Sequence, residues 1–288
     1  MTFLFNLFYQ FGDALSFLLL AAIGLAVIFG MMKIINLAHG EFITIGAYGT
    51  VVSAKIFNLP LPVAMLIGIL VTVIFGYLLE RVLIRHLYGR PLDSVVATWG
   101  ISLIVSQSFL VIFGPSFEGL QTPLSNFQVG EYSYSQYRLV LIFISILILL
   151  VLYTFFLKSN FGTLARATIE NPTIAATLGV KVDNIYTVTF CIGSALAGLT
   201  GAIYAPTMTI VPSIGQAFII SAFVTVVTAG ASPFVGLIPA ASFLSLVQTS
   251  ITFYYHATIG VLALLFSVIL IIRFLPNGFS GLLSKLNK

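Results

Sequence analysis

Long stretches without a charged side chain are the feature that most restricts how this chain can fold. Of its 288 residues, 59% are hydrophobic and 7% are charged, whereas ordinary soluble domains carry about 25% charged residues. A helix of about 20 apolar residues is long enough to cross the hydrocarbon core of a bilayer. The sequence therefore predicts an all-α integral membrane protein, a polytopic bundle of transmembrane helices.

Nine apolar segments are candidates for these helices. Six are long enough to span a membrane by themselves, and three are short or rich in small residues. Irregular backbone at membrane depth is tolerated only against protein or water, so we expect short broken or re-entrant helices among the three. The prediction is eight or nine crossings. The long segments are 14–32, 61–79, 94–113, 139–157, 185–205 and 257–274, and the short ones are 42–54, 216–229 and 237–253.

The distribution of Lys and Arg predicts the orientation. Cytoplasmic loops carry an excess of these residues. With nine crossings and an outside N-terminus, Lys55 and Arg138 fall outside, and all the other basic residues fall inside. The loops 80–93 and 158–183 and the C-terminus are then cytoplasmic. The inside residues are Lys33, Arg81, Arg85, Arg90, Lys158, Arg166, Lys181, Arg273, Lys285 and Lys288. The outer loop 114–138 carries Tyr132, Tyr134 and Tyr137, which suits an interfacial aromatic belt.

A polar segment interrupts the apolar N-terminal third. Asn36, His39 and Glu41 lie between two runs that contain no charged residue. An ionisable group in hydrocarbon costs about 2.5 to 3.5 kcal/mol on insertion scales, so such groups normally face a cavity, a partner or the interface. Two interpretations stay open. The three residues line or support a solute path, or Asn36 caps the next helix, Glu41 sits in its first turn and Gly40 allows close packing.

Small residues predict where helices approach one another. Gly193, Ala197 and Gly201 recur at four-residue spacing, a pattern of close helix packing. A second pattern relates two parts of the chain, because Gly40–Phe42 and Gly215–Phe218 each open a short segment. In the predicted topology these segments run in opposite directions, as inverted repeats do around a solute path. This similarity makes Gln216 a further candidate path residue.

The inner loop 158–183 contains residues typical of the beginning and end of a short helix, and we expect this helix to pack against protein. Asn171 is a cap candidate, Pro172 follows at the first helical position, and Gly179 is placed to end the helix. Few of its residues are large and apolar, so a helix lying in the lipid interface is the weaker alternative. A short helix outside the membrane gives a partner protein something to bind.

Several motifs together resemble the LivH-type permeases of ABC importers, which take up branched-chain amino acids, with sister members for urea and short amides. The resemblance runs in order from about Ala14 to Gly281. The run Ala97-Thr98-Trp99-Gly100 resembles the urea branch more than the amino-acid branch, where a Thr-Ile-Gly version is expected. No Lys or Arg lies at mid-span, and together these features favour urea or a short amide. The motifs lie at 36–48, 80–81, 88–92, 97–100 and 166–179, and the tail 273–279 is similar to the family's Arg-Pro-x-Gly ending, displaced by two residues.

The resemblance implies a single permease domain over 1–288 in the cell (inner or plasma) membrane, with membrane lipid around it. It also implies a second permease subunit, identical or related, a separate ATPase and an extracytoplasmic solute-binding protein. The translocation path would include Asn36, His39, Glu41, Trp99 and Gln216. The inner loop would couple to the ATPase through Arg166, Glu170, Asn171, Pro172, Ala176 and Gly179.

Catalysis by this chain is not expected. It has no Gly-x-x-x-x-Gly-Lys-Ser/Thr loop to hold phosphates, so a partner would hydrolyse ATP. His39, His86 and His256 are far apart in the sequence and do not have metal-ligand spacing, and no cofactor or nucleic-acid partner is expected. The alternatives are a standalone urea channel, a secondary transporter or a membrane enzyme acting on lipid. The docked helix favours the importer, because a channel has no use for it.

Overall fold

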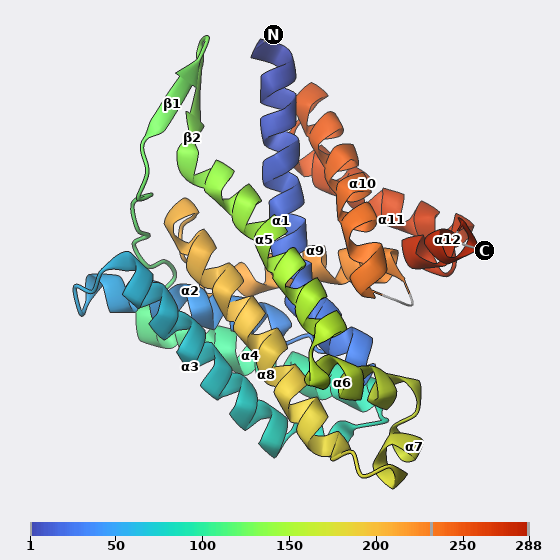
Figure 1. Cartoon of the computed structure of the whole chain (residues 1–288). Coiled ribbons are helices and arrows are strands. Elements are labelled where there is room, and N and C mark those ends of the chain that lie inside the picture. Colours follow the sequence, from blue (N-terminus) through green and yellow to red (C-terminus); the bar gives the residue numbers. More distant parts are fainter. Residues whose placement is uncertain (1, 231–232, 287–288) are drawn as a thin grey trace. The chain divides into compact units, whose positions relative to one another are not determined.

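The computed structural model describes residues 2–230 and 233–286 and is built almost entirely of helices (Figure 1), which confirms the predicted all-α class. Lys288, one of the predicted cytoplasmic cations, lies outside these residues. The elements are α1 (Thr2–Met32), α2 (His39–Lys55), α3 (Leu61–Val82), η1 (Ile84–Leu87), α4 (Pro91–Phe113), β1 (Asn126–Val129), β2 (Tyr132–Ser135), α5 (Gln136–Lys158), α6 (Asn160–Glu170), α7 (Pro172–Thr177), α8 (Val182–Tyr204), η2 (Ala205–Thr207), α9 (Ile214–Ala229), α10 (Pro233–Tyr254), α11 (Ala257–Phe274) and α12 (Gly278–Leu286).

Within the described ranges, seven helices are long and apolar enough to cross a membrane, namely α1, α3, α4, α5, α8, α10 and α11. Helix α11 coincides with the predicted segment 257–274. Two of the three short segments remain short in the structure, since α2 has 17 residues and α9 has 16. The third, 237–253, belongs to α10, which is long enough to span.

The described chain divides into two compact units. Unit 1 consists of 1–22, 122–150 and 221–288, and unit 2 consists of 23–121 and 151–220. The polar segment before α2, the helices α2 to α4 and the inner loop all belong to unit 2. The candidate functional residues therefore lie in unit 2.

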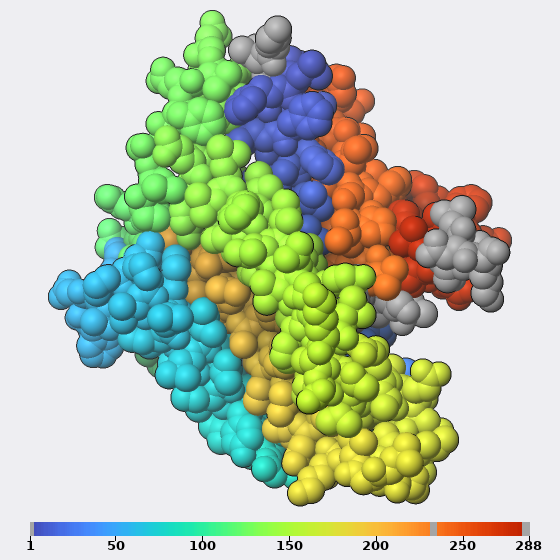
Figure 2. Space-filling model, viewed as in Figure 1, coloured from blue at the N-terminus to red at the C-terminus, as the bar shows by residue number. Residues whose placement is uncertain are grey.

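Close packing of α8 against α2 and α3 forms the centre of unit 2. Figures 1 and 2 show α3 and α8 side by side. A Cβ atom added to Gly46 would lie 2.3 Å from the carbonyl oxygen of Gly198, and one added to Gly201 would lie 1.9 Å from that of Ile43. Backbones can only come this near where no side chain intervenes. The small-residue face predicted on α8 is thus confirmed as a packing surface.

A β-hairpin in unit 1 was not predicted. Strands β1 and β2 pair antiparallel with Phe127 opposite Tyr134, and Gly130 takes φ +65° at the first turn position, as a type II′ turn requires. Tyr134 (4% exposed) packs its ring against Phe5 and Tyr9 of α1. Tyr137 is buried too (5%). The predicted interfacial belt is therefore wrong for Tyr134, because the hairpin folds against α1, and for Tyr137, which is buried at the start of α5, whereas Tyr132 is exposed.

An ion pair in unit 1 explains why α1 begins earlier than predicted. The predicted segment starts at residue 14, after Asp13, whereas α1 starts at Thr2. The guanidinium of Arg138 donates a hydrogen bond to the carboxylate of Asp13. Because its charge is paired, Asp13 lies inside the helix instead of ending it.

We expect Gly46→Ala to lower the free energy of unfolding by about 1 to 3 kcal/mol, and with it the melting temperature, because the added methyl group has no room in a packed contact. Gly100→Ala is the matched control, since Gly100 is also helical but nothing lies within 4 Å of its added Cβ. That control should be neutral or stabilise by up to about 1 kcal/mol. Thermal unfolding of the detergent-purified variants measures the difference. Equal melting temperatures would contradict the packing argument.

Candidate functional site

The polar segment lies where α1 meets α2, and residues 33–38 join the two helices. Lys33 is exposed and takes φ +53°, a left-handed conformation that ends α1. The side-chain oxygen of Asn36 accepts a hydrogen bond from the backbone N–H of Ala38 (3.0 Å). The residue at the cap position of α2 is Ala38, so the predicted capping by Asn36 is wrong. Asn36 instead closes a turn just before the helix, as Asn side chains commonly do.

The three polar residues singled out in the sequence lie in the interior of unit 2. Asn36, His39 and Glu41 are 1%, 0% and 1% exposed. Glu41 occupies the first turn of α2, as predicted, where the positive end of the helix dipole favours an anion. The hydroxyl of Ser102 on α4 donates to its carboxylate (2.8 Å). Within unit 2 the segment is therefore enclosed by protein.

One face of α4 holds this segment in place. The buried residues of α4 are Ser94, Thr98, Ser102 and Ser106, one on each successive turn, and we call them the hydroxyl face. Ser94 donates to the carbonyl oxygen of Ile35 (3.4 Å), and Thr98 accepts from the N–H of Leu37 (3.0 Å). The sequence analysis missed this face. Its signal was the four-residue spacing of hydroxyl residues within an otherwise apolar segment.

Two other predicted path residues lie elsewhere. Trp99 follows Thr98 on α4, but its side chain is 58% exposed, and Gln216 near the start of α9 is exposed as well. Both side chains thus lie at the surface of unit 2, whereas Asn36, His39 and Glu41 are buried in it. The five predicted residues thus separate into a buried group and an exposed group.

The starts of α2 and α9 touch through their backbones. Gly40 and Gly215 are each the second residue of their helix. A Cβ added to Gly40 would lie 2.1 Å from the carbonyl oxygen of Gly215, and one added to Gly215 would lie 2.5 Å from that of Gly40. The two similar motifs noted in the sequence therefore meet in the fold, at the points where their helices begin.

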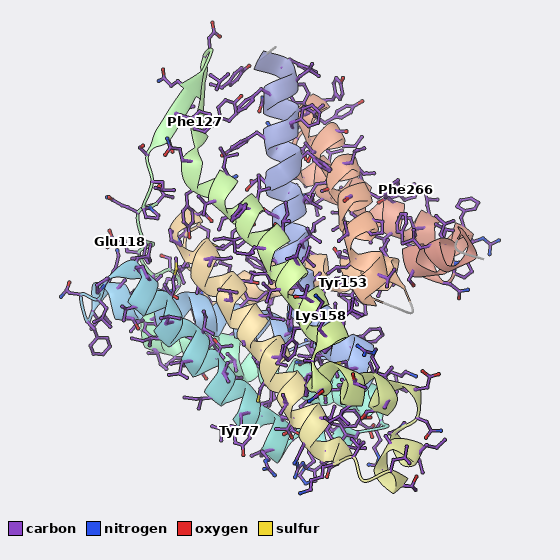
Figure 3. All side chains as sticks on the ribbon, in the orientation of Figure 1. Tyr77, Glu118, Phe127, Tyr153, Lys158 and Phe266 are labelled. Carbon is purple, nitrogen blue, oxygen red and sulfur yellow. The ribbon has the colours of Figure 1, made fainter. Side chains whose placement is uncertain are left out.

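Aromatic rings cover α2 further along the helix. The ring centroid of Tyr48 lies 4.4 Å from that of Phe109 and 5.0 Å from that of Phe113, and both phenylalanines belong to α4. At the last residue of α2, the ammonium of Lys55 pairs with the carboxylate of Glu118 and lowers the pKa of that carboxyl. In Figure 3, Glu118 lies beside the start of α3, whereas Tyr77 lies on α3 toward its end. This end of α2 is thus closed by contacts with α4 and the loop that follows it.

A second buried carboxylate, which entered the sequence analysis only as part of the motif 80–81, lies near the end of α3. Glu80 is 0% exposed and accepts hydrogen bonds from the hydroxyls of Tyr88 (2.5 Å) and Thr187 (3.0 Å). Arg85 is the nearby cation, with its Nε 3.8 Å from the carboxylate. We call these four residues the Glu80 cluster. Burial, and then the bond to Glu80, raise the pKa of Tyr88, so its hydroxyl remains a donor at neutral pH.

The inner loop is helical, with the start and stop that the sequence predicts. The side chain of Asn171 accepts from the N–H of Ile174 (3.0 Å), and Pro172 is the first residue of α7. Gly179 takes φ +87° and donates to the carbonyl of Ala176 (3.0 Å), while the N–H of Val180 reaches that of Ala175 (3.1 Å). This pair of bonds is a Schellman motif, which ends a helix at a left-handed glycine.

Helix α7 presents apolar side chains outward. Ile174 is 57% exposed and Leu178, directly after the helix, is 78% exposed, whereas Ala175 is buried. Figure 2 shows this segment at the surface, and Figure 1 shows α6 and α7 beside the start of α8. The guanidinium of Arg166 donates to the carbonyl of Phe156, so this predicted coupling residue holds α6 against the end of α5.

Comparison with known proteins places this arrangement in a family. The family described as branched-chain amino acid transport system / permease component matches residues 7–275. The chain belongs to this family. The permease BraD of Pseudomonas aeruginosa, from a high-affinity branched-chain amino acid transport system, is 31% identical over 77% of the chain and 76% of its own length. A probable LivH of Methanocaldococcus jannaschii is 27% identical over 92% and 89%. No solved structure matches.

Membership of this family makes the chain a multi-pass membrane permease of the ABC-transporter type, a component that is not itself an enzyme. LivH of Escherichia coli K12 is 24% identical over 91% of the chain and 90% of its own length. Across the described residues, no group of three or more His, Cys, Asp and Glu side chains could hold a metal ion. The polar segment, the hydroxyl face and α7 are therefore best understood as parts of a transporter.

Glu41→Gln tests whether the buried polar segment serves transport or only packing. Glutamine keeps the size and most hydrogen bonding of the side chain but removes the charge. If the segment serves transport, uptake of labelled leucine by cells should fall, while the amount of folded protein and its assembly with partners remain normal. Ser106→Ala is the control, because its hydroxyl bonds only within α4 in the described contacts. Equal losses of expression and uptake in Glu41→Gln would support packing alone.

Proposed function

We propose that this chain is the permease subunit of an ABC importer for branched-chain amino acids, folded as one permease domain over 1–288. The observation that carries the proposal is the family match across residues 7–275, because it includes both the polar segment and the inner loop. The BraD and LivH relatives are named for the transport of branched-chain amino acids. In this proposal the N-terminus lies outside the cell membrane and the C-terminus lies in the cytoplasm.

The proposed importer has four kinds of component. A second permease subunit completes the path, and a related chain is a reasonable candidate, since a probable LivM of Methanocaldococcus jannaschii is 27% identical over 68% of this chain and 58% of its own length. An ATPase supplies the energy and an extracytoplasmic binding protein delivers the solute. Asn36, His39 and Glu41 would support the path from inside the subunit, while the exposed Trp99 and Gln216 are free to face the partner or the solute.

The names of the relatives, which refer to branched-chain amino acids, outweigh the preference for urea. That preference depends partly on Trp99, where the amino-acid branch is expected to have isoleucine. Thr98, which both versions contain, holds the polar segment, whereas Trp99 points out of unit 2. The exchange of Trp for Ile therefore changes an exposed position and leaves the buried contacts alone. Branched-chain amino acids are accordingly the proposed solutes.

Uptake of labelled leucine and labelled urea, in cells with and without this chain, tests the proposed solute. We expect leucine uptake to depend on the chain and urea uptake to be unchanged by its deletion. Re-expression of the chain should restore leucine uptake. Dependence of urea uptake alone would support the urea branch instead, and purification of the chain without an ATPase would support a standalone channel.

The helix α7 is the proposed docking element for the ATPase, with Glu170, Asn171, Pro172, Ala176 and Gly179 shaping the contact. Its exposed Ile174 and Leu178 offer the apolar surface that a docked helix needs. The stop at Gly179 matters because it fixes the direction in which the chain leaves α7 for α8.

Gly179→Val should impair solute-stimulated ATP hydrolysis in the reconstituted complex. Nothing lies within 4 Å of an added Cβ at this position, so the effect would come from the left-handed backbone, which costs a β-branched residue about 1 to 2 kcal/mol or more. Gly179→Asn is the matched control, since asparagine tolerates this conformation. Solute-stimulated ATP hydrolysis at the wild-type rate in Gly179→Val would contradict the docking proposal.

A further inference from the structure

The Glu80 cluster joins three segments of unit 2, and the proposed function above gives it no role. Glu80 ends α3, Tyr88 belongs to the turn before α4, and Thr187 lies in the second turn of α8. A carboxylate buried inside protein is strongly unfavourable unless its oxygens are paired. The two hydroxyl donors therefore fix the starts of α4 and α8 to the end of α3.

On one side, the cluster is connected to the proposed docking helix. The Gly179 turn leads directly from α7 into α8, which begins at Val182, and both α6 and α7 contact α8. The ring of Tyr186, next to Thr187, lies 4.9 Å from that of Tyr88. The Gly179 turn thus joins α7 directly to the first two turns of α8, where Thr187 belongs to the cluster.

On the other side, the cluster is connected to the polar segment. Tyr88 stands just before Pro91, the first residue of α4. Along α4, the hydroxyl face then bonds to Ile35, Leu37 and Glu41 in turn. Helix α4 therefore links the Glu80 cluster at its start with the polar segment alongside its middle.

The hydroxyl of Thr187 has two acceptors at the same distance. Its oxygen lies 3.0 Å from a carboxylate oxygen of Glu80 and 3.0 Å from the backbone carbonyl oxygen of Asp183, one turn earlier in α8. A hydroxyl has one proton to donate. It can bond to Glu80 or turn to its own helix, and in neither case is it left without a partner. Coupling between distant sites requires such an element with two discrete arrangements.

We propose that the Glu80 cluster is the joint that passes movement of α7 through α4 to the polar segment, with Glu80, Tyr88 and Thr187 as positioning residues for coupling ATP hydrolysis to solute passage. The proposal rests on the importer function proposed above. It predicts that the cluster affects the stimulation of hydrolysis by solute and leaves assembly and basal hydrolysis of the complex unchanged.

Thr187→Val and Thr187→Ser form the decisive pair, because valine keeps the shape without the hydroxyl and serine keeps the hydroxyl. The full complex, with its partner permease, ATPase and leucine-loaded binding protein, is reconstituted in liposomes. The measurements are the ratio of leucine-stimulated to basal ATP hydrolysis and the leucine transported per ATP. We expect Thr187→Val to lower both by at least about threefold, within the range of coupling changes caused by single substitutions. Thr187→Ser should match the wild type.

Thr189→Val is the position control, since the buried hydroxyl of Thr189 bonds to Ile185 of its own helix and to the sulfur of Met31. It should leave the ratio unchanged. An assembled Thr187→Val complex with the wild-type ratio overturns the inference. If that variant does not assemble, Tyr88→Phe decides the question by the same ratio. A wild-type complex without leucine stimulation rejects the proposed function, and the inference with it.

Discussion

The close approach of α8 to α2 and α3 is the contact on which the rest of unit 2 depends. Helix α2 has 17 residues and begins beside buried polar side chains. Lipid cannot satisfy such groups, so the start of the helix has to be surrounded by protein. Contacts at Gly46, Gly198 and Gly201 bring the backbones together and provide that surrounding. In hydrocarbon, a charged group such as that of Glu41 would cost about 2.5 to 3.5 kcal/mol.

Much of the fold follows from local sequence, because a helix in lipid needs a long apolar run and small residues mark where helices touch. The segment 257–274 and the stop at Gly179 were predictable for this reason. The start of α1 was not, because the apolar run begins after Asp13, whereas the helix continues through Asp13, whose charge pairs with Arg138 far along the chain. The hairpin was not predictable either, since two four-residue strands depend on their contact with α1.

The candidate site was predictable only in part. Asn36, His39 and Glu41 stand out because polar residues are rare in apolar surroundings, but the pattern does not say which side chain will meet them. Ser102 is 61 residues from Glu41 in the sequence. Glu80 looks like an ordinary charge at the end of a membrane helix, and one of its donors, Thr187, is 107 residues away. Trp99 was predicted as a path residue from the family resemblance. It is exposed on α4, whereas its neighbour Thr98 is buried in unit 2.

The hydroxyl face has a mechanical consequence. Ser94 and Thr98 each also bond a carbonyl oxygen of the preceding turn, at 2.7 Å. If α4 moved away from the segment before α2, both hydroxyls would keep these bonds, but the N–H of Leu37 would lose its acceptor and the carbonyl of Ile35 its donor. A buried polar group left unsatisfied costs about 1 to 3 kcal/mol. Contacts between glycine backbones offer no such replacement, because parting them leaves an empty gap between the helices. Unit 2 therefore combines a core of α2, α3 and α8, held by contact between backbones, with a fourth helix held to it by polar bonds that Ser94, Thr98 and Ser102 make.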